Sequence, residues 1–247
     1  MERVRHLRNA PILEALVDFR VTLPKDVNIE AFRTLALGDR YPTVEALHRF
    51  QTSITWQPGA NKPVDAKTAE LRPGGYAFRS SDRLNVAQFR IDGFTYNRLR
   101  PYTSWDELQP EVLRLWGLYQ HTARPETCSR IAVRYINKID VPQGAELSDY
   151  LTAPPAVPKG LPDILTGFLT RVLIHDNKSG VSASVTQASQ VQLDPPSPAV
   201  ILDIEAYRQS DAGALHQQVE PALADLHDMK NRIFFGSVTK DQLKRYE

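Results

Sequence analysis

The chain has 247 residues, of which 42% are apolar, and it carries 30 Lys and Arg against 29 Asp and Glu. This composition is typical of a globular protein with one large domain or two small ones. A net charge near zero excludes a global field that would draw the whole molecule to nucleic acid or to an anionic membrane. Any charged binding surface must therefore be local.

The single cysteine and the lengths of the apolar runs bear on the compartment. Cys128 excludes an internal disulfide, and its place near the start of a predicted strand favours a packing residue over a reactive thiol. Glu14, Asp18 and Arg20 interrupt the apolar stretch near the start, which argues against a signal peptide. No apolar run approaches the ~18 residues of a membrane span. We therefore expect a soluble cytoplasmic protein that does not associate with membranes.

The first half of the chain predicts strands followed by a long helix. Period-two alternation predicts a strand over 12–22 that stops before Pro24, with a short helical stretch after it. Further strands are expected near 47–56 and over 75–81, 84–91 and 94–100, the last two joined at Asp92-Gly93, while 42–50 is also compatible with a helix. Ser104 and Glu107 form a capping box that begins a helix with an apolar face. The segment 57–75 is predicted to be a mobile loop.

The second half repeats this order. Strands are expected over 130–141, 166–176, 180–191 and 199–208, and a helix begins near Ser210 or Asp211. The connector 152–162 is rich in proline and is expected to be stiff. Pro110 and Pro221 fall inside the two predicted long helices, so each helix should kink there or begin just before.

Two pairs of segments indicate an internal repeat. Residues 18–37 align with 135–154 at an offset of 118, and 107–119 align with 218–230 at an offset of 111. We therefore predict an α+β fold made by duplication of a β-α-β(3–4)-α unit, with halves 1–125 and 126–247 in one compact pseudo-twofold unit. Its antiparallel curved sheet would carry the long helices on one face, an element order similar to TATA-binding-protein-like and helix-grip folds.

The duplication predicts how the halves join. A pseudo-twofold would pair the first strand of each half antiparallel, so that facing residue numbers have a constant sum. A sum of 152 sets Glu14 opposite Lys138 and Asp18 opposite Arg134. Opposite charges across strands contribute roughly 0.2–1 kcal/mol each, so charge favours this register.

Three stretches together resemble a known protein family. They are "NAPILEALVDFRV", "RIAVRYINKIDVP" and "LHDMKNRIFFGSVT" (226–239). They are similar to a sporadically distributed, uncharacterised family of bacterial proteins of about this length. The resemblance implies a bacterial cytoplasmic protein and carries over no catalytic residues.

An arginine-rich segment is the first candidate binding surface. Arginines alternate with aromatic residues between 72 and 100, at Arg72, Arg79, Arg83, Arg90, Arg98 and Arg100, with Tyr76, Phe78, Phe89, Phe94 and Tyr96 among them. Arginine pairs bidentately with phosphate or carboxylate, and aromatic rings stack on bases. The segment therefore predicts an anionic partner, either nucleic acid or an acidic protein. The alternative is an ordinary sheet with the aromatic side chains inward and the arginines in water.

A buried amide is the second candidate. Asn137 lies on the apolar face of the strand over 130–141, where an unpaired amide would cost about 1–3 kcal/mol. It either bonds the backbone at a bulge or helix end, or belongs with Tyr135 to a polar pocket between sheet and helix that receives a small ligand.

The remaining motifs give little chemistry. His216, Glu220 and His227 could share one helical flank as ligands for Zn²⁺ or Fe²⁺, but they are more typical of the boundary of a buried stripe. Ser179, His175 and Asp176 crowd into one predicted hairpin turn, where such residues are common for backbone reasons. No catalytic residue and no cofactor is predicted.

These observations favour a non-enzymatic binding or interaction protein that engages an anionic partner. The alternative is a small-ligand binder or a metal-assisted enzyme that uses a pocket between sheet and helices. The sequence leaves the oligomeric state open.

Overall fold

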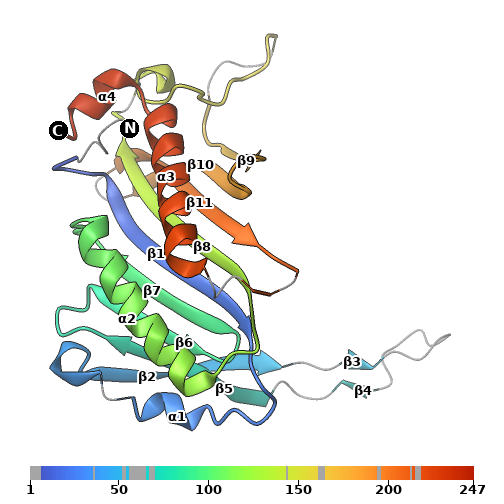
Figure 1. Ribbon diagram of the computed structural model, residues 1–247. Helices are drawn as coiled ribbons and strands as arrows, with labels where there is room; N and C mark the ends of the chain where they lie inside the picture. Colours follow the sequence, from blue (N-terminus) through green and yellow to red (C-terminus); the bar gives the residue numbers. More distant parts are fainter. Residues whose placement is uncertain are drawn as a thin grey trace.

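The computed structural model describes residues 7–35, 37–51, 54–55, 65–66, 70–142, 144–160, 165–193, 196–211, 213–214 and 218–247. These residues form a nine-stranded antiparallel sheet with two long helices lying across one face (Figure 1). The strand order is β2-β5-β6-β7-β1-β8-β11-β10-β9, so that β2 and β9 are the two edges. The α+β class and the antiparallel sheet are as predicted.

The first half contributes five strands of the large sheet and the helix α2. Its elements are β1 (Ile12–Thr22), α1 (Glu30–Arg33), η1 (Gly38–Arg40), β2 (Thr43–Gln51), β3 (Ile54–Thr55), β4 (Asp65–Ala66), β5 (Glu70–Arg79), β6 (Asn85–Arg90), β7 (Gly93–Leu99) and α2 (Trp105–Ala123). The helical alternative for 42–50 is wrong, because this segment pairs with β5 as β2. Of the predicted loop 57–75, residues 57–64 and 67–69 lie outside the described residues, while 70–75 belong to β5.

The second half contributes four strands and the helix α3. Its elements are β8 (Thr127–Asp140), η2 (Leu147–Asp149), β9 (Leu169–Asp176), β10 (Val181–Leu193), β11 (Pro196–Gln209), α3 (Val219–Ser237) and α4 (Lys240–Lys244). The candidate start of the last long helix near Ser210 is too early, because α3 begins at Val219 and Pro221 lies in its first turn. In α2, the predicted cap is present: the hydroxyl of Ser104 accepts a hydrogen bond from the amide of Glu107 at 3.2 Å.

One glycine is required by a close approach of two strands. The turn between β6 and β7 is made by residues 91–92, and Gly93 begins β7 with a φ of 157°. A Cβ atom at Gly93 would lie 1.9 Å from the carbonyl oxygen of Phe19 on β1. The glycine therefore allows β7 to lie against β1 at this point.

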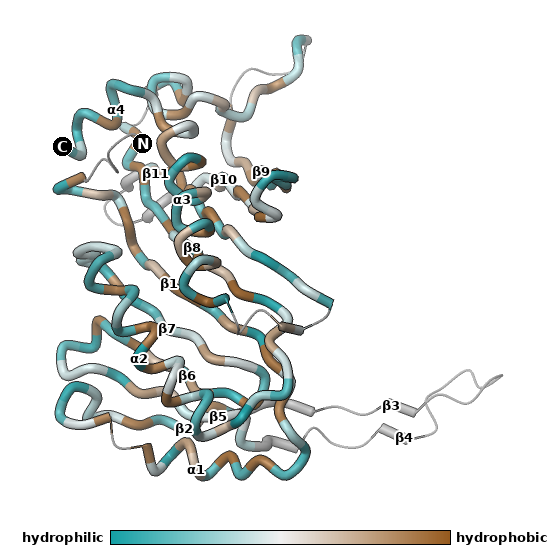
Figure 2. The backbone as a smooth tube through the Cα atoms, viewed as in Figure 1, coloured by the Kyte–Doolittle hydropathy of each residue, from teal (hydrophilic) through white to brown (hydrophobic). Residues whose placement is uncertain are grey.

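The helices bury the apolar face of the sheet. Along β1, the side chains of Ala15, Val17, Phe19 and Val21 lie under the helices, and Figure 2 shows apolar and polar residues alternating along the central strands. Phe19 stacks on Trp116 of α2, with ring centroids 4.2 Å apart. Cys128, at the start of β8, is fully buried, and this burial raises the pKa of its thiol to about 12. It behaves as a packing residue, as its position in the sequence predicts.

The first strands of the two halves pair antiparallel as predicted, but the register is different. Glu14 faces Ile136 instead of Lys138, and Asp18 faces Ala132 instead of Arg134. Each central strand has two neighbours, and Asp18 finds its closest partners on the side away from β8, on β7 and on the strand beyond it, β6. The carboxylate of Asp18 accepts hydrogen bonds from Arg90 of β6 at 3.0 Å and from Thr95 of β7 at 2.6 Å.

Arg134 of β8 likewise finds its partner on a strand other than β1. Its guanidinium donates to Asp203 of β11, with Nε at 2.8 Å from Oδ1. The charge prediction considered a single strand pair, and it fails because Asp18 and Arg134 make their shorter contacts with other strands. Between β1 and β8, Asp18 lies 4.0 Å from Arg130 and does not face Arg134.

Substitution of Asp18 tests this network. Its side chain is 15% exposed, and Arg130 of β8 also lies 4.0 Å from it. Asp18→Asn keeps the shape but leaves partly buried guanidinium groups without a counter-charge, so we expect the free energy of unfolding to fall by about 3 kcal/mol. Urea denaturation measures this change. The exposed Asp26 provides the control, since Asp26→Asn should stay within ~0.5 kcal/mol of the native protein, and equal effects of the two substitutions would contradict the network.

Candidate functional site

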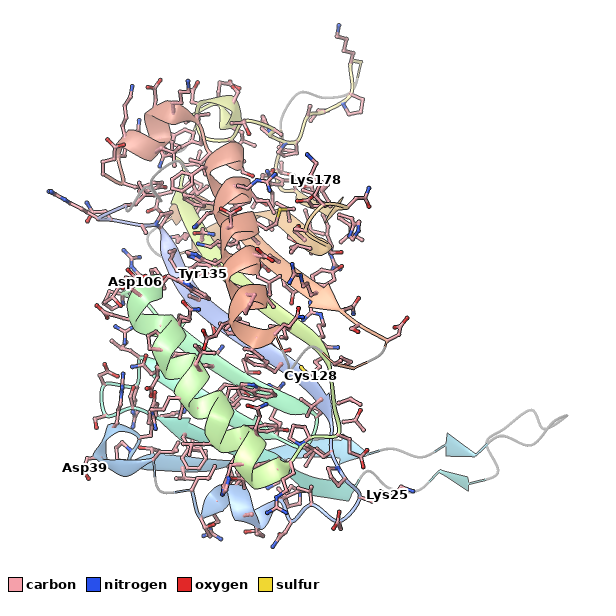
Figure 3. All side chains as sticks on the ribbon, viewed as in Figure 1. Lys25, Asp39, Asp106, Cys128, Tyr135 and Lys178 are labelled. Atoms are coloured by element: carbon pink, nitrogen blue, oxygen red, sulfur yellow. The ribbon has the colours of Figure 1, made fainter. Side chains whose placement is uncertain are left out.

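A cavity of about 460 Å³ lies between the start of α2, the second half of α3 and the strands β1 and β8. Its walls are aromatic and aliphatic, and several polar groups face it. The apolar lining is Leu7, Ala10, Ile12, Trp105, Phe234 and Phe235, and the polar lining is Tyr102, Thr103, Ser104, Asp106, Asn137, His227, Lys230 and Asn231. We call this cavity the Lys230 pocket. Figure 3 shows Asp106 at the start of α2 and Tyr135 between the start of α2 and α3.

The pocket lies where two groups of buried apolar side chains meet. Ile12 belongs to the larger group under α2, whereas Leu7 and Phe234 belong to the smaller group near the end of α3. Ile12 faces Asn137 across β1 and β8, and the pairing shifts by one residue between Ile12 and Glu14. The irregular pairing therefore lies at the pocket, since both Ile12 and Asn137 line it.

Lys230 is placed in the interior by the periodicity of α3. Leu223, Leu226 and Phe234 are buried on one stripe of the helix, and Lys230 lies on the same stripe with a relative exposure of 6%. Its ammonium donates to Oδ1 of Asn231 at 2.6 Å and lies 3.6 Å from the centre of the Tyr135 ring. Among the described residues, no carboxylate comes within ion-pair distance of this ammonium.

Burial of Lys230 sets its protonation. Removal of the amine from water disfavours the charged form and lowers the pKa of Lys230 to about 7. At neutral pH, the side chain is therefore divided between ammonium and free amine. Lysines are rarely buried unless they are paired, so a buried lysine without a carboxylate partner marks this cavity as a candidate functional site.

Tyr135, whose ring lies beneath the amine, is hydrogen-bonded to a second tyrosine. The hydroxyl groups of Tyr102 and Tyr135 are hydrogen-bonded at 2.8 Å, and their rings meet edge to face. Burial raises the pKa of Tyr102 to about 12 and that of Tyr135 well above its usual range. Both hydroxyl groups therefore stay neutral, and Tyr102 lines the pocket.

His227 forms part of the same wall. Its imidazole stacks on Trp105, with centroids 4.3 Å apart and an interplanar angle of 7°. Burial, and next the charge of Lys230, lower the pKa of His227 to about 3. The imidazole is thus neutral at physiological pH, and its Nε2 lies 3.5 Å from the amide nitrogen of Asn231.

The two alternatives for Asn137 turn out to be compatible. Its amide nitrogen donates to the carbonyl oxygens of Leu202, at 3.0 Å, and Tyr135, at 3.3 Å, next to the irregular pairing with Ile12. Asn137 also lines the Lys230 pocket, as predicted for a pocket between sheet and helix. Tyr135 is not part of the lining itself, but the ammonium of Lys230 lies over its ring.

The described residues contain no group of three or more metal-ligating side chains. Of the candidate ligands, His216 lies outside the described residues, Glu220 is exposed, and His227 is stacked on Trp105. The described part of the chain thus offers no ligand set for a metal-assisted enzyme.

The arginine-rich segment does not expose aromatic rings. Five rings expected beside the arginines are buried under the helices, namely those of Tyr76, Phe78, Phe89, Phe94 and Tyr96. The alternative of an ordinary sheet with its aromatic side chains inward is confirmed for these rings, and exposed stacking surfaces are not formed by them, because the sheet places them on its covered face.

Several of the candidate arginines have partners within the protein. Arg79 pairs with Glu45 at 3.1 Å, and Arg90 pairs with Asp18 and Asp92. Arg98 donates to the carbonyl oxygen of Pro101 and to Asn85. Arg83 and Arg100 are exposed, and the side chain of Arg72 lies outside the described residues. Recognition of nucleic acid or of an acidic protein by these arginines stays a prediction.

A second hollow, of about 1170 Å³, lies beside the connector that follows β8. It is lined largely by proline, glycine and small side chains of residues 141–168 and by the adjoining ends of β10 and β11. Glu146 and Lys159 are the charged residues of its described lining. Both are exposed, and the described lining of this hollow has no buried charged group such as Lys230.

Sequence reasoning found Asn137 and His227 but missed Tyr102, Trp105, Lys230 and Asn231. Lys230 carried a readable signal, since a lysine interrupts the apolar stripe of α3 between Leu226 and Phe234. Tyr102 and Trp105 come from the other half of the chain, and their convergence with α3 depends on the tertiary packing.

Comparison with known proteins gives no further constraint. No family model matches the chain, and neither does any curated protein. The resemblance to a bacterial family therefore stays a prediction. Within the described residues, no helix is both long and apolar enough to cross a membrane.

Charge reversal separates structural arginines from exposed ones. Arg90→Glu would place a third carboxylate beside Asp18 and Asp92, so we expect it to lower the free energy of unfolding by about 3 kcal/mol. Arg83→Glu should leave the free energy of unfolding within ~0.5 kcal/mol of the native value, and urea denaturation measures both variants.

A binding experiment tests the exposed arginines. If these arginines bind a polyanion, Arg83→Glu and Arg100→Glu will weaken salt-sensitive binding of an oligonucleotide at unchanged stability. Equal binding by the native protein and both variants would rule out this surface.

Replacement of Lys230 should stabilise the protein at low pH. The unfolded chain binds a proton at Lys230 up to a pH of about 10.4, whereas the folded protein releases it near pH 7. The burial cost of the ammonium is therefore fully present below pH 7 and disappears as the pH rises toward 10. Lys230→Met should raise the free energy of unfolding by about 1–4 kcal/mol at pH 6 and have little effect at pH 10.

Denaturant titrations at both pH values measure this difference. The exposed Lys240 provides the matched control, because Lys240→Met should change stability little and without this pH dependence. A Lys230→Met variant that is less stable than the native protein at pH 6 would show that the amine stabilises the fold.

Proposed function

We propose that the protein binds a small organic molecule in the Lys230 pocket. The observation that carries this proposal is the buried amine of Lys230, which faces a cavity and has no carboxylate partner among the described residues. A methionine or leucine at this position would continue the apolar stripe of α3 without the cost of burying a charge. Side chains that cost stability in a cavity are typical of binding sites.

The lining supports a ligand of mixed character. The rings of Trp105, Phe234 and Phe235 offer apolar contact, and a few polar groups converge on the same space, which is the usual composition of small-molecule sites. The neutral donors and acceptors of Tyr102 and Asn137 would orient oxygen or nitrogen atoms of the ligand. A small planar molecule with an oxygen function near Lys230 fits this arrangement best.

The proposal is for binding rather than catalysis. Within the described residues, the pocket holds one group that titrates near neutral pH, since burial keeps Tyr102 and His227 neutral there. General acid–base catalysis commonly uses two such groups in opposite protonation states.

We also propose that the two halves arose by duplication. On both sides of the β1–β8 pair, the next strands are β7, β6, β5 and β11, β10, β9, so that each half adds its strands in reverse chain order. Leu16 and Arg134, which the 118-residue offset makes equivalent, face each other in the β1–β8 pairing. A pseudo-twofold axis would pass between them, and α2 and α3 would be equivalent helices, as in TATA-binding-protein-like folds.

An NMR titration with benzyl alcohol tests the ligand site. This neutral aromatic molecule has one oxygen function, and we expect shifts of the Trp105 indole and the Asn231 side-chain amide. At ten times its Kd it should stabilise the protein by roughly 1.4 kcal/mol. Trp105→Ala removes a wall of the pocket and should abolish the shift of the Asn231 amide and the stabilisation. Trp105→Phe should retain part of both. Shifts scattered over the surface, unchanged in Trp105→Ala, would contradict the proposal.

A further inference from the structure

We infer that Lys230 captures an aldehyde or ketone as an imine, so that the ligand of the pocket is a carbonyl compound. This inference rests on the proposed ligand-binding function and names the chemical class of the ligand. It follows from the position of the amine in the cavity, from the groups around it and from what the pocket lacks for other ligands.

The amine is held in surroundings that leave it partly uncharged. The groups close to it are the Tyr135 ring from β8 and His227 and Asn231 from α3, and Tyr102 from the segment before α2 is hydrogen-bonded to Tyr135. None of these carries a charge at neutral pH, and the one carboxylate of the described lining, Asp106, is exposed at the rim. Lysines desolvated in this way act as nucleophiles toward carbonyl compounds.

An anionic ligand is a weaker match for the same pocket. The described lining contains no arginine, and the Asp106 carboxylate would repel an anion. In the first turn of α2, the amide of Glu107 is already bonded to the hydroxyl of Ser104. An anion would therefore find Lys230 as its single cationic partner, whereas a neutral carbonyl compound needs only the amine and the aromatic walls.

The reaction balances without any other reagent. The lone pair of the neutral Lys230 amine attacks the carbonyl carbon, and a proton passes from nitrogen to the former carbonyl oxygen to give a carbinolamine. The remaining proton on nitrogen then passes to this hydroxyl group, so that water leaves as the carbon–oxygen bond breaks and the carbon–nitrogen double bond forms. The carbonyl of Asn231, which accepts from the amine at 2.6 Å, orients the nucleophile.

Reductive trapping of the full-length protein tests the inference. The protein is incubated with benzaldehyde and sodium cyanoborohydride at pH 7.0, and the modified lysines are identified by peptide mapping. About half of Lys230 is neutral at this pH, compared with roughly one in 10³ of an ordinary exposed lysine. We expect benzylation of Lys230 to be at least about tenfold faster than that of the exposed Lys240. The rate at Lys230 should rise with pH and level off above about pH 8.

Competition and substitution complete the test. Benzyl alcohol fills the same space without a carbonyl group and should slow labelling of Lys230 but not of Lys240. Lys230→Arg should remove the fast-labelled site while the other lysines are labelled as before. Labelling of Lys230 no faster than that of Lys240 would overturn the imine inference. In that case, the benzyl alcohol titration decides the broader proposal: specific shifts at Trp105 would leave the ligand pocket standing, and their absence would remove both.

Discussion

The antiparallel pairing of β1 with β8 is the constraint on which the rest of the structure depends. This pair lies at the centre of the sheet, and it brings together two segments more than 100 residues apart in the chain. Its register places Val17 against Val133 and Phe19 against Ile131 on the covered face, where α2 and α3 pack. The pairing is regular at its centre and shifts near Ile12, and the Lys230 pocket opens at that irregular end. The pairing shifts again between Arg20 and Val21, and the pocket lies at the first of these two ends.

The individual strands and the start of α2 could be predicted from the sequence, but the register between strands could not. Alternating residues predicted the strands because a sheet covered on one face requires that period, and Ser104 predicted the start of α2 because its hydroxyl is well placed to cap it. The register of β1 against β8 could not be obtained from charges on two strands. Asp18 and Arg134 each had a second neighbour, and Arg90 and Asp203 became visible as partners only once the strand order was known.

The candidate site shows the same division. Asn137 could be found because an amide on an apolar strand face requires partners wherever the strand packs. Lys230 was harder to recognise, because lysines on amphipathic helices commonly extend their amine to solvent along apolar neighbours. Here the ring of Tyr135 and the walls of the pocket hold the amine inside instead. Trp105 stacks on His227 from the other half of the chain, and no local pattern could connect these two residues.

The fully buried thiol of Cys128 allows a simple chemical experiment on the β1–β8 pair. The residue lies opposite Val21 at one end of the β1–β8 pair, and it is the one cysteine of the chain. A thiol reagent can reach it only after β8 separates from its surroundings, and the raised pKa makes the closed form unreactive. The rate of alkylation therefore reports how often this end of the β1–β8 pair opens, and it measures that opening without any added label.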